Sequence, residues 1–212
     1  MTTPLVGEIL NGVWRFEALH PEWTEEEGGE EGWEPLVAWW SVRTPEGLVL
    51  VDPLIDDWPP LDDLVSAEGG CAGLVRTCHW HQRSIGEAAA RYRAEVWAKP
   101  DPDGDPEPRF DHGITDGQEM FSAITAFEVE RDDEVALWVA EANALIFGDA
   151  MLRRRAGELR VCPDGWTQPE GGAARLRSVL KGLTRLPVEH VLVSHGPLVL
   201  GDGSASLRRA LG

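Results

Sequence analysis

Histidine and aspartate side chains stand at the ends of three apolar runs in the sequence. His79 and His81 follow the first run with one residue between them, Asp149 ends the second, and His195 ends the third. Short, wholly apolar runs are typical of strands buried on both faces, and ligands bind at such strand ends in open α/β sheets. A His-x-His at the end of a strand is expected to place both imidazoles on one side of a turn, where they can hold a metal ion.

These residue types suit hydrolytic metal chemistry. Imidazole nitrogens and carboxylate oxygens bind Zn²⁺, and iron or manganese are the alternatives. Such an ion lowers the pKa of a bound water and polarises an ester, thioester, amide or phosphoryl oxygen. Each signal is weak alone, because a single His or Asp at a strand end is more often structural. The combination in this order is more specific.

The elements that must position these residues alternate along one continuous pattern. No linker divides the chain, so we expect a single domain over residues 1–212. In the first half we expect strands at 9–19, 36–43, 48–52, 73–77 and 94–98, and helices at 58–68 and 84–92. In the second half we expect strands at 121–130, 134–140, 144–149 and 190–194, and helices at 173–183 and 205–211. Residues 153–172 are expected to be irregular.

An acidic, glycine-containing insertion lies between the first two expected strands. It spans residues 21–35 and carries Trp23 and Trp33 near its ends. Charge runs of this kind are usually solvated loops. The functional alternative is a flap over the site, with one of the two tryptophans touching the substrate.

The composition restricts the classes of partner and compartment. The formal net charge is −18, from 37 acidic and 19 basic residues, whereas binding to nucleic acid or an anionic membrane needs a basic face. Three cysteines and no C-x-x-C make no disulfide framework, and no apolar run approaches the roughly 20 residues that span a bilayer. Without a signal-peptide pattern, we expect a cytoplasmic protein that binds a small-molecule substrate or ligand. A homo-oligomer remains open.

The order of these motifs resembles the metallo-β-lactamase-fold superfamily from about Val13 to about Leu211. The matching stretches are an early strand ending in Asp52, the residues Thr77–Ser84 on the signature His-x-His-x-Asp-His, a Gly148-Asp149 strand end and a final His195-Gly196. The resemblance implies an α+β fold, a four-layer αβ/βα sandwich, with the site along one edge of the paired sheets. It also implies that Asp149 is the carboxylate that bridges two metals in the family.

The sequence departs from the family where the second metal would bind. Arg83 and Ser84 stand where the signature has Asp and His, and an Arg cannot ligate a cation. The family's third histidine falls near Glu130, about 19 residues before Asp149 by the family's spacing. One interpretation is therefore a hydrolase with at most one ion, most naturally zinc, on His79, His81 and Asp149. Glu130 or His195 would complete the ligand set.

Arg83 and His195 are the expected catalytic residues in this first interpretation. Arg83 would stabilise developing negative charge, and His195 would orient the substrate or act as a fourth ligand. In the alternative interpretation the protein binds no metal and is a non-catalytic binding protein. Arg83 then occupies the vacated metal site and forms an ion pair with Asp149, a pairing that is geometrically favourable when buried.

Overall fold

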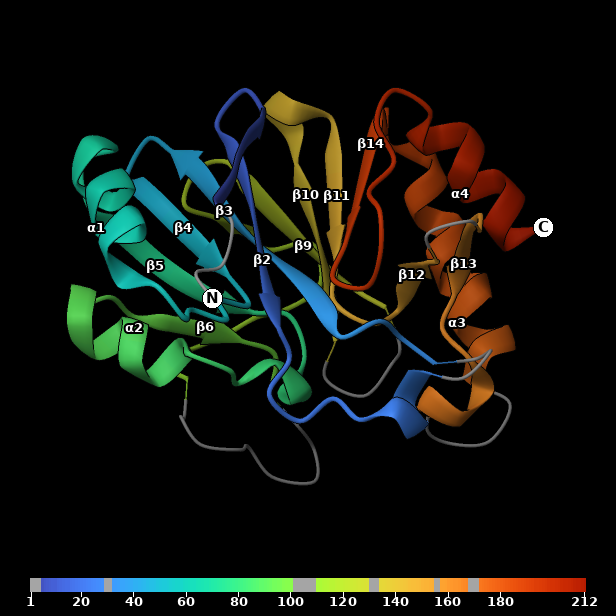
Figure 1. The fold of residues 1–212 in the computed structure, drawn as a ribbon. Helices are drawn as coiled ribbons and strands as arrows, with labels where there is room; N and C mark the ends of the chain where they lie inside the picture. Colours follow the sequence, from blue (N-terminus) through green and yellow to red (C-terminus); the bar gives the residue numbers. More distant parts are fainter. Residues whose placement is uncertain (1–4, 29–31, 101–109, 130–133, 155–156, 168–171) are drawn as a thin grey trace.

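The first of two large sheets takes its strands from the amino-terminal half of the chain. The computed structural model describes residues 5–28, 32–100, 110–129, 134–154, 157–167 and 172–212. Seven strands pair in sequence order, antiparallel from β1 to β4 and parallel from β4 to β7 (Figure 1). They are β1 (Leu5–Leu10), β2 (Val13–Leu19), β3 (Leu36–Thr44), β4 (Gly47–Val51), β5 (Cys71–Arg76), β6 (Val96–Ala98) and β7 (His112–Gly113).

The second sheet takes its strands from the carboxyl-terminal half, in the order β14-β11-β10-β9-β8. β11 and β14 are parallel, and the other pairs are antiparallel. The strands are β8 (Glu119–Met120), β9 (Ile124–Glu128), β10 (Val135–Val139), β11 (Ala144–Phe147) and β14 (His190–Val193). A separate hairpin joins β12 (Met151–Arg153) and β13 (Leu159–Val161), and β13 lies in the stretch expected to be irregular.

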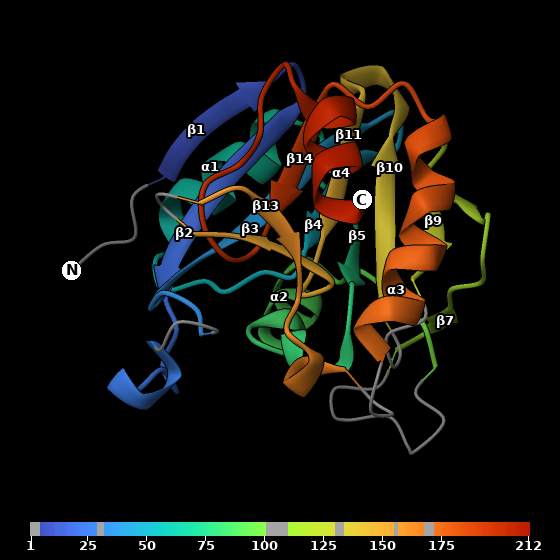
Figure 2. The same ribbon diagram turned by 90° about the vertical axis from the view of Figure 1, so that its right-hand side faces the viewer.

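Two helices cover the outer face of each sheet, which gives four layers. The helices α1 (Trp58–Ala67) and α2 (Ile85–Tyr92) lie on one outer side, and α3 (Gly172–Leu180) and α4 (Gly203–Leu211) on the other (Figures 1 and 2). The expected α+β fold, a four-layer αβ/βα sandwich, is therefore confirmed. Within the described ranges, no helix is long and apolar enough to span a membrane.

The apolar runs form central strands because both of their faces are buried. In β4, Val49 and Val51 belong to the core between the two sheets, whereas Leu48 and Leu50 belong to the core beneath α1 and α2. Successive side chains of a strand point to opposite faces, so a continuous apolar run supplies both cores. β11 repeats this pattern between the central core and the core beneath α3 and α4.

The two sheets meet where the site residues emerge. The backbone N–H of Ala38 in β3 donates to the carbonyl of Ser194 at 2.8 Å, and Val37 and His195 form an isolated antiparallel bridge. This bridge ties the end of β14 to the first sheet. The carboxyl ends of β4, β5, β11 and β14 therefore deliver Asp52, the segment after Arg76, Asp149 and His195 to one region.

Candidate functional site

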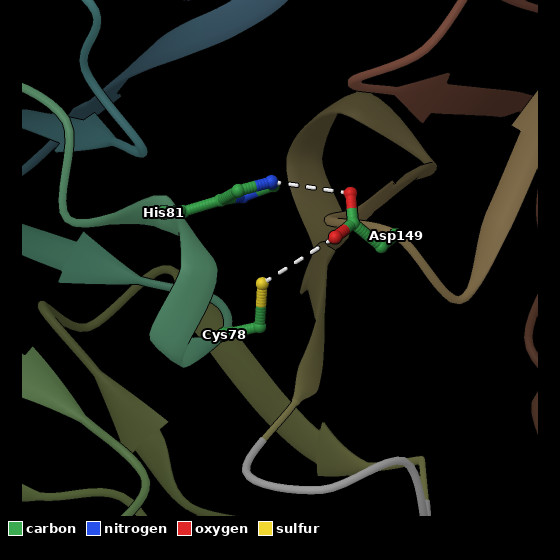
Figure 3. A group of neighbouring side chains, drawn as sticks. All are labelled: Cys78, His81 and Asp149. Carbon is green, nitrogen blue, oxygen red and sulfur yellow. Dashed lines mark hydrogen bonds and ion pairs between the residues drawn. The ribbon is translucent and has the colours of Figure 1, made fainter. Parts of the chain in front are cut away.

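The chain turns sharply directly after β5, and this turn decides which side chains enter the site. Residues His79–His81 form a 3₁₀ helix in which the backbone N–H of His81 donates to the carbonyl of Cys78 at 3.0 Å. A 3₁₀ helix has three residues per turn, so side chains three apart share a face. Cys78 and His81 therefore point together toward Asp149 (Figure 3).

Three contacts fix the orientation of the His81 imidazole. Its Nδ1 lies 2.8 Å from Oδ2 of Asp52 and 3.3 Å from the hydroxyl of Thr77. Its Nε2 lies 3.1 Å from Oδ1 of Asp149. Asp52 also accepts the backbone N–H of Thr77 at 2.7 Å, so the carboxylate that holds His81 is itself held by the chain. This is the carboxylate–histidine arrangement that supports metal-binding imidazoles.

The Asp149 carboxylate is the meeting point of the site. Its Oδ1 lies 2.9 Å from Nε2 of His195, in addition to the His81 contact, and its Oδ2 lies 3.9 Å from the Cys78 sulfur. Glu134 fixes the backbone at Asp149, because its Oε1 accepts hydrogen bonds from the N–H groups of Asp149 and Ala150 at 2.9 and 2.8 Å. Glu134 is fully buried.

Gly148 is required for this close packing. A Cβ at position 148 would lie 2.5 Å from the Thr77 hydroxyl and 3.1 Å from Glu134 Oε1. Side chains essentially never approach so closely, so any larger residue would displace the groups that hold His81 and Asp149.

Cys78, His81 and Asp149 together have the character of a metal-binding group. One ligand atom from each lies within 4.8 Å of the others, and all three residues are buried. Thiolate, imidazole and carboxylate are ligand types of Zn²⁺, and the second-layer contact from Asp52 leaves Nε2 of His81 facing the other two. The residues present therefore fit a single zinc-type ion.

Burial and neighbouring charges shift the pKa values of His81 and Asp149 in opposite directions. Burial and the Arg83 charge oppose protonation of His81, but Cys78, Asp52 and Asp149 together hold its pKa well above the usual value. Burial would raise the pKa of Asp149, yet the His81 charge and the hydrogen bonds from His195 and His81 hold it well below the usual value. The metal-free site therefore contains an imidazolium–carboxylate pair.

The other two groups around Asp149 are neutral near pH 7. Burial lowers the pKa of His195, although Asp149 opposes the shift. Burial raises the pKa of the Cys78 thiol to about 12. Metal binding would have to release a proton from Cys78 and from His81.

Arg83 lies beside the site without touching Asp149. Its Nη1 donates to the backbone carbonyls of Asp52 at 3.1 Å and Ala38 at 3.5 Å. Its backbone has a positive φ of 38°, as the chain bends into α2. In the described part of the chain its charge acts on Asp149 only through space. The metal-free interpretation predicted a direct ion pair between Arg83 and Asp149, and this prediction is wrong. The two carbonyls hold the Arg83 guanidinium, and the imidazoles of His81 and His195 contact Oδ1 of Asp149.

The structure does not bring every expected ligand together. His81, Asp149 and His195 meet, whereas His79 is half-buried, and its ring centroid lies 4.2 Å from that of Trp80. The expectation that both imidazoles share one side assumed an extended chain, and the 3₁₀ turn removes that alternation. Glu130 lies outside the described residues.

A pocket of about 410 Å³ opens onto this cluster. His81, Arg83, Asp149 and His195 lie along it, and its other lining residues are His20, Glu22, Glu27, Trp33, Trp80, Gly165 and Trp166. The indole of Trp33 meets His195 edge-on, with ring centroids 5.0 Å apart. The acidic insertion thus supplies an aromatic wall, as the flap interpretation of residues 21–35 expected for one of its tryptophans.

From the sequence, Cys78 could be a soft metal ligand, but a core role was the favoured interpretation, and Glu134 was missed as part of the site. Cys78 alternates away from His79 in an extended strand, and only the 3₁₀ spacing of Cys78 and His81 could have identified it. Glu134 follows two aspartates and resembles a solvated acidic run. Its position directly before an apolar strand was the one feature of the sequence that could have indicated its burial.

Comparisons with known proteins identify the fold family. A family profile described as the metallo-beta-lactamase superfamily matches residues 36–211. No curated protein matches the chain significantly.

Similar solved structures include a metallo-beta-lactamase from Pontibacter korlensis, with 15% identity, a TM-score of 0.68 and 99% of both chains covered. FIM-1 from Pseudomonas aeruginosa, in a mono-zinc form, has 14% identity, a TM-score of 0.64 and coverage of 100% of this chain and 95% of its own. TTHA1623, in a di-iron-bound form, has 21% identity, a TM-score of 0.63 and coverage of 82% and 93%. These similarities show a shared fold. Because the family profile matches residues 36–211, the chain belongs to the metallo-beta-lactamase superfamily.

Proposed function

We propose that the protein is a metal-dependent hydrolase of small molecules that holds at most one ion. Cys78, His81 and Asp149 would be its ligands, and His195 would lie beside them. The observation that carries the proposal is the convergence of these three ligand atoms within 4.8 Å, beside a pocket that His81 and Asp149 line. Zinc suits this donor set best, and iron or manganese remain alternatives.

The restriction to one ion rests on Arg83. Its guanidinium lines the pocket beside the cluster, and its fixed positive charge would repel a second cation. Expected ligand roles for His79 and Glu130 stay predictions.

Each side chain has a distinct role in this proposal. Asp52 holds Nδ1 of His81, which leaves Nε2 directed toward Asp149. His195 donates from Nε2 to Oδ1 of Asp149 and orients that carboxylate. Arg83 provides a positive charge near the reacting atoms, where it would stabilise the oxyanion that develops when water attacks an acyl or phosphoryl group. An ion in this site supplies a bound water of lowered pKa and polarises the substrate oxygen.

The test is a hydrolase screen of purified protein with p-nitrophenyl esters, thioesters and phosphate esters. Activity should disappear after chelation, return with one equivalent of zinc, and be lost in Cys78→Ser. Cys162→Ser is the matched control, because Cys162 is equally buried but lies in the core beneath α3 and α4. Activity that survives both chelation and Cys78→Ser would refute the proposal.

The metal-free binding protein is a second candidate, favoured by the contacts that His81 and His195 make with Asp149. Asp149 Oδ1 already has two imidazole partners, so the cluster is compatible with a stable site that lacks an ion. A zinc stoichiometry near zero, unchanged by added zinc or iron, would select this candidate.

A further inference from the structure

The pocket has opposite charges at its two ends. We propose that its substrate carries a cationic, ammonium-type group, which is recognised by the indoles of Trp33, Trp80 and Trp166 that line the pocket and by the carboxylates of Glu22 and Glu27 at its mouth. The cleaved bond would lie at the floor. This inference rests on the hydrolase function proposed above and names its substrate class.

The floor is the positive end of the pocket. Arg83 lies there with its Nε buried and without a hydrogen-bond partner in the described ranges. The negative charge of Asp149 is already engaged by His81 and His195. A substrate would therefore direct the oxygen atoms of its acyl or phosphoryl group toward Arg83 and any bound ion.

The mouth is the negative end. Glu22 and Glu27 are both exposed and line the pocket. The histidine next to them adds no charge near pH 7, because burial and the charge of Arg83 lower the pKa of His20. No Lys or Arg other than Arg83 lines the pocket in the part of the chain that the structure describes.

Aromatic rings surround the space between these ends. Trp80 is 63% exposed, which is unusual for an indole and leaves its surface available to a ligand. Trp33 and Trp166 both meet His195 edge-on, with centroid separations of 5.0 and 5.7 Å. Glu27 accepts the Trp33 indole N–H at 3.2 Å and so holds that ring in place. Indole faces attract alkylammonium groups, and a nearby carboxylate adds to that attraction.

Pocket size and overall charge agree with this class of substrate. A volume of about 410 Å³ falls within the range of small-molecule sites. The formal net charge of −18 would attract cations toward the protein and repel anionic substrates, with an effect that salt screens.

The first experiment measures binding to metal-free protein by calorimetry and indole fluorescence. Choline is the cationic probe, 3,3-dimethyl-1-butanol is its neutral isostere, and butyrate is the anionic probe. We expect choline to bind about tenfold more tightly than the alcohol, with affinity that falls as salt rises. Equal binding of the isostere, or tighter binding of butyrate, would overturn the inference.

A matched pair of variants tests whether Glu27 contributes to choline binding. Glu27→Gln removes the charge but keeps an acceptor for Trp33, and should weaken choline binding about threefold to tenfold. Glu26→Gln is the control, since Glu26 is exposed in the same 3₁₀ turn but does not line the pocket. Equal losses in both variants would contradict the assignment.

A second experiment separates this inference from the hydrolase proposal. Benzoylcholine and its neutral isostere 3,3-dimethylbutyl benzoate are offered to zinc-loaded protein. Hydrolysis of benzoylcholine consumes one water, breaks the acyl C–O bond and releases benzoate, choline and a proton. Selective choline binding without hydrolysis of any ester would refute the hydrolase proposal alone. Hydrolysis of both esters with equal kcat/KM would refute the cation preference alone.

Discussion

Three buried carboxylates lie within one small region of this protein, and each has a different role. Asp52 holds His81 and the backbone of Thr77, Glu134 holds the backbone at Asp149, and Asp149 faces the pocket. Buried charges are costly unless they are paired, so the arrangement explains why the residues around these acids are imidazoles and backbone N–H groups.

Asp52→Asn tests the support of His81. The substitution removes the charge that fixes the imidazole while keeping a side chain of the same size. We expect zinc affinity to fall about 10- to 100-fold, the usual effect of losing a partner behind a metal-binding histidine. Competition titration against a zinc chelator measures this change, with Asp57→Asn as a control outside the site. An unchanged affinity would show that Asp52 does not orient His81.

The pH dependence follows from the opposite shifts of His81 and Asp149. Because the folded pKa of His81 is raised, its stabilisation is complete below about pH 6.5 and is lost as pH rises through the folded value. Because the folded pKa of Asp149 is lowered, its contribution is present above about pH 4 and is lost as pH falls through the folded value.

In metal-free protein, the contribution of His81 and Asp149 to the free energy of unfolding should therefore be greatest between about pH 4 and pH 6.5. Zinc binding displaces protons from His81 and Cys78, so the stabilisation by zinc should grow as pH rises. Thermal melts with and without zinc across this range measure both effects. A zinc-induced shift that shrinks with rising pH would contradict these assignments.

At the level of elements, the 3₁₀ turn at His79–His81 determines which side chains lie beside Asp149. Apolar runs and strand ends could be predicted from sequence because burial on both faces leaves a clear pattern. The turn could not, because a change from a period of two to a period of three spans only three residues and carries no composition signal. This is why the sequence placed His79, and the structure places Cys78, beside His81 and Asp149.

Two single substitutions test the turn. His81→Ala should abolish zinc binding, because it removes a proposed ligand. His79→Ala should leave the zinc affinity within about threefold of wild type, which is a smaller change than the loss of a residue that supports a ligand would cause. Isothermal titration of both variants gives the comparison. Equal loss in both would mean that the two histidines share the ion, as an extended His-x-His predicts.

Short patterns also explain why the hairpin of β12 and β13 was not predicted from the sequence. Its strands have three residues each and flank a glycine- and arginine-containing turn region, so no alternation is long enough to read. The longer elements around it were predictable, because their patterns extend over two or more turns or pleats.

At the scale of the molecule, the two large sheets and the β12–β13 hairpin are joined near Gly196. A Cβ there would lie 1.5 Å from the carbonyl oxygen of Arg153, and the backbone φ is +96°. The carbonyl of Gly196 also accepts Arg15 Nη2 at 3.3 Å, and Arg153 N–H donates to the carbonyl of His195 at 2.9 Å. This segment thus connects β14, the β12–β13 hairpin and the first sheet.

Gly196→Ala should destabilise the whole fold, because it adds a backbone clash to an unfavourable φ. We expect a loss of about 2–4 kcal/mol in the free energy of unfolding. Gly201→Ala is the control, since Gly201 has a φ of +77° and nothing within 4 Å of its added Cβ, so it should lose only about 1 kcal/mol. Denaturant unfolding measures both variants. Equal losses would show that the close approach at Gly196 is relieved at no cost.

We propose that one ion binds to Cys78, His81 and Asp149. Titration of chelator-treated protein with Co²⁺, followed by absorption spectroscopy, tests this binding, because a cobalt–thiolate bond has its own charge-transfer band. We expect saturation at one equivalent, with a thiolate band that is lost in Cys78→Ser and kept in Cys162→Ser. Absence of cobalt binding, or a spectrum unchanged by Cys78→Ser, would contradict it.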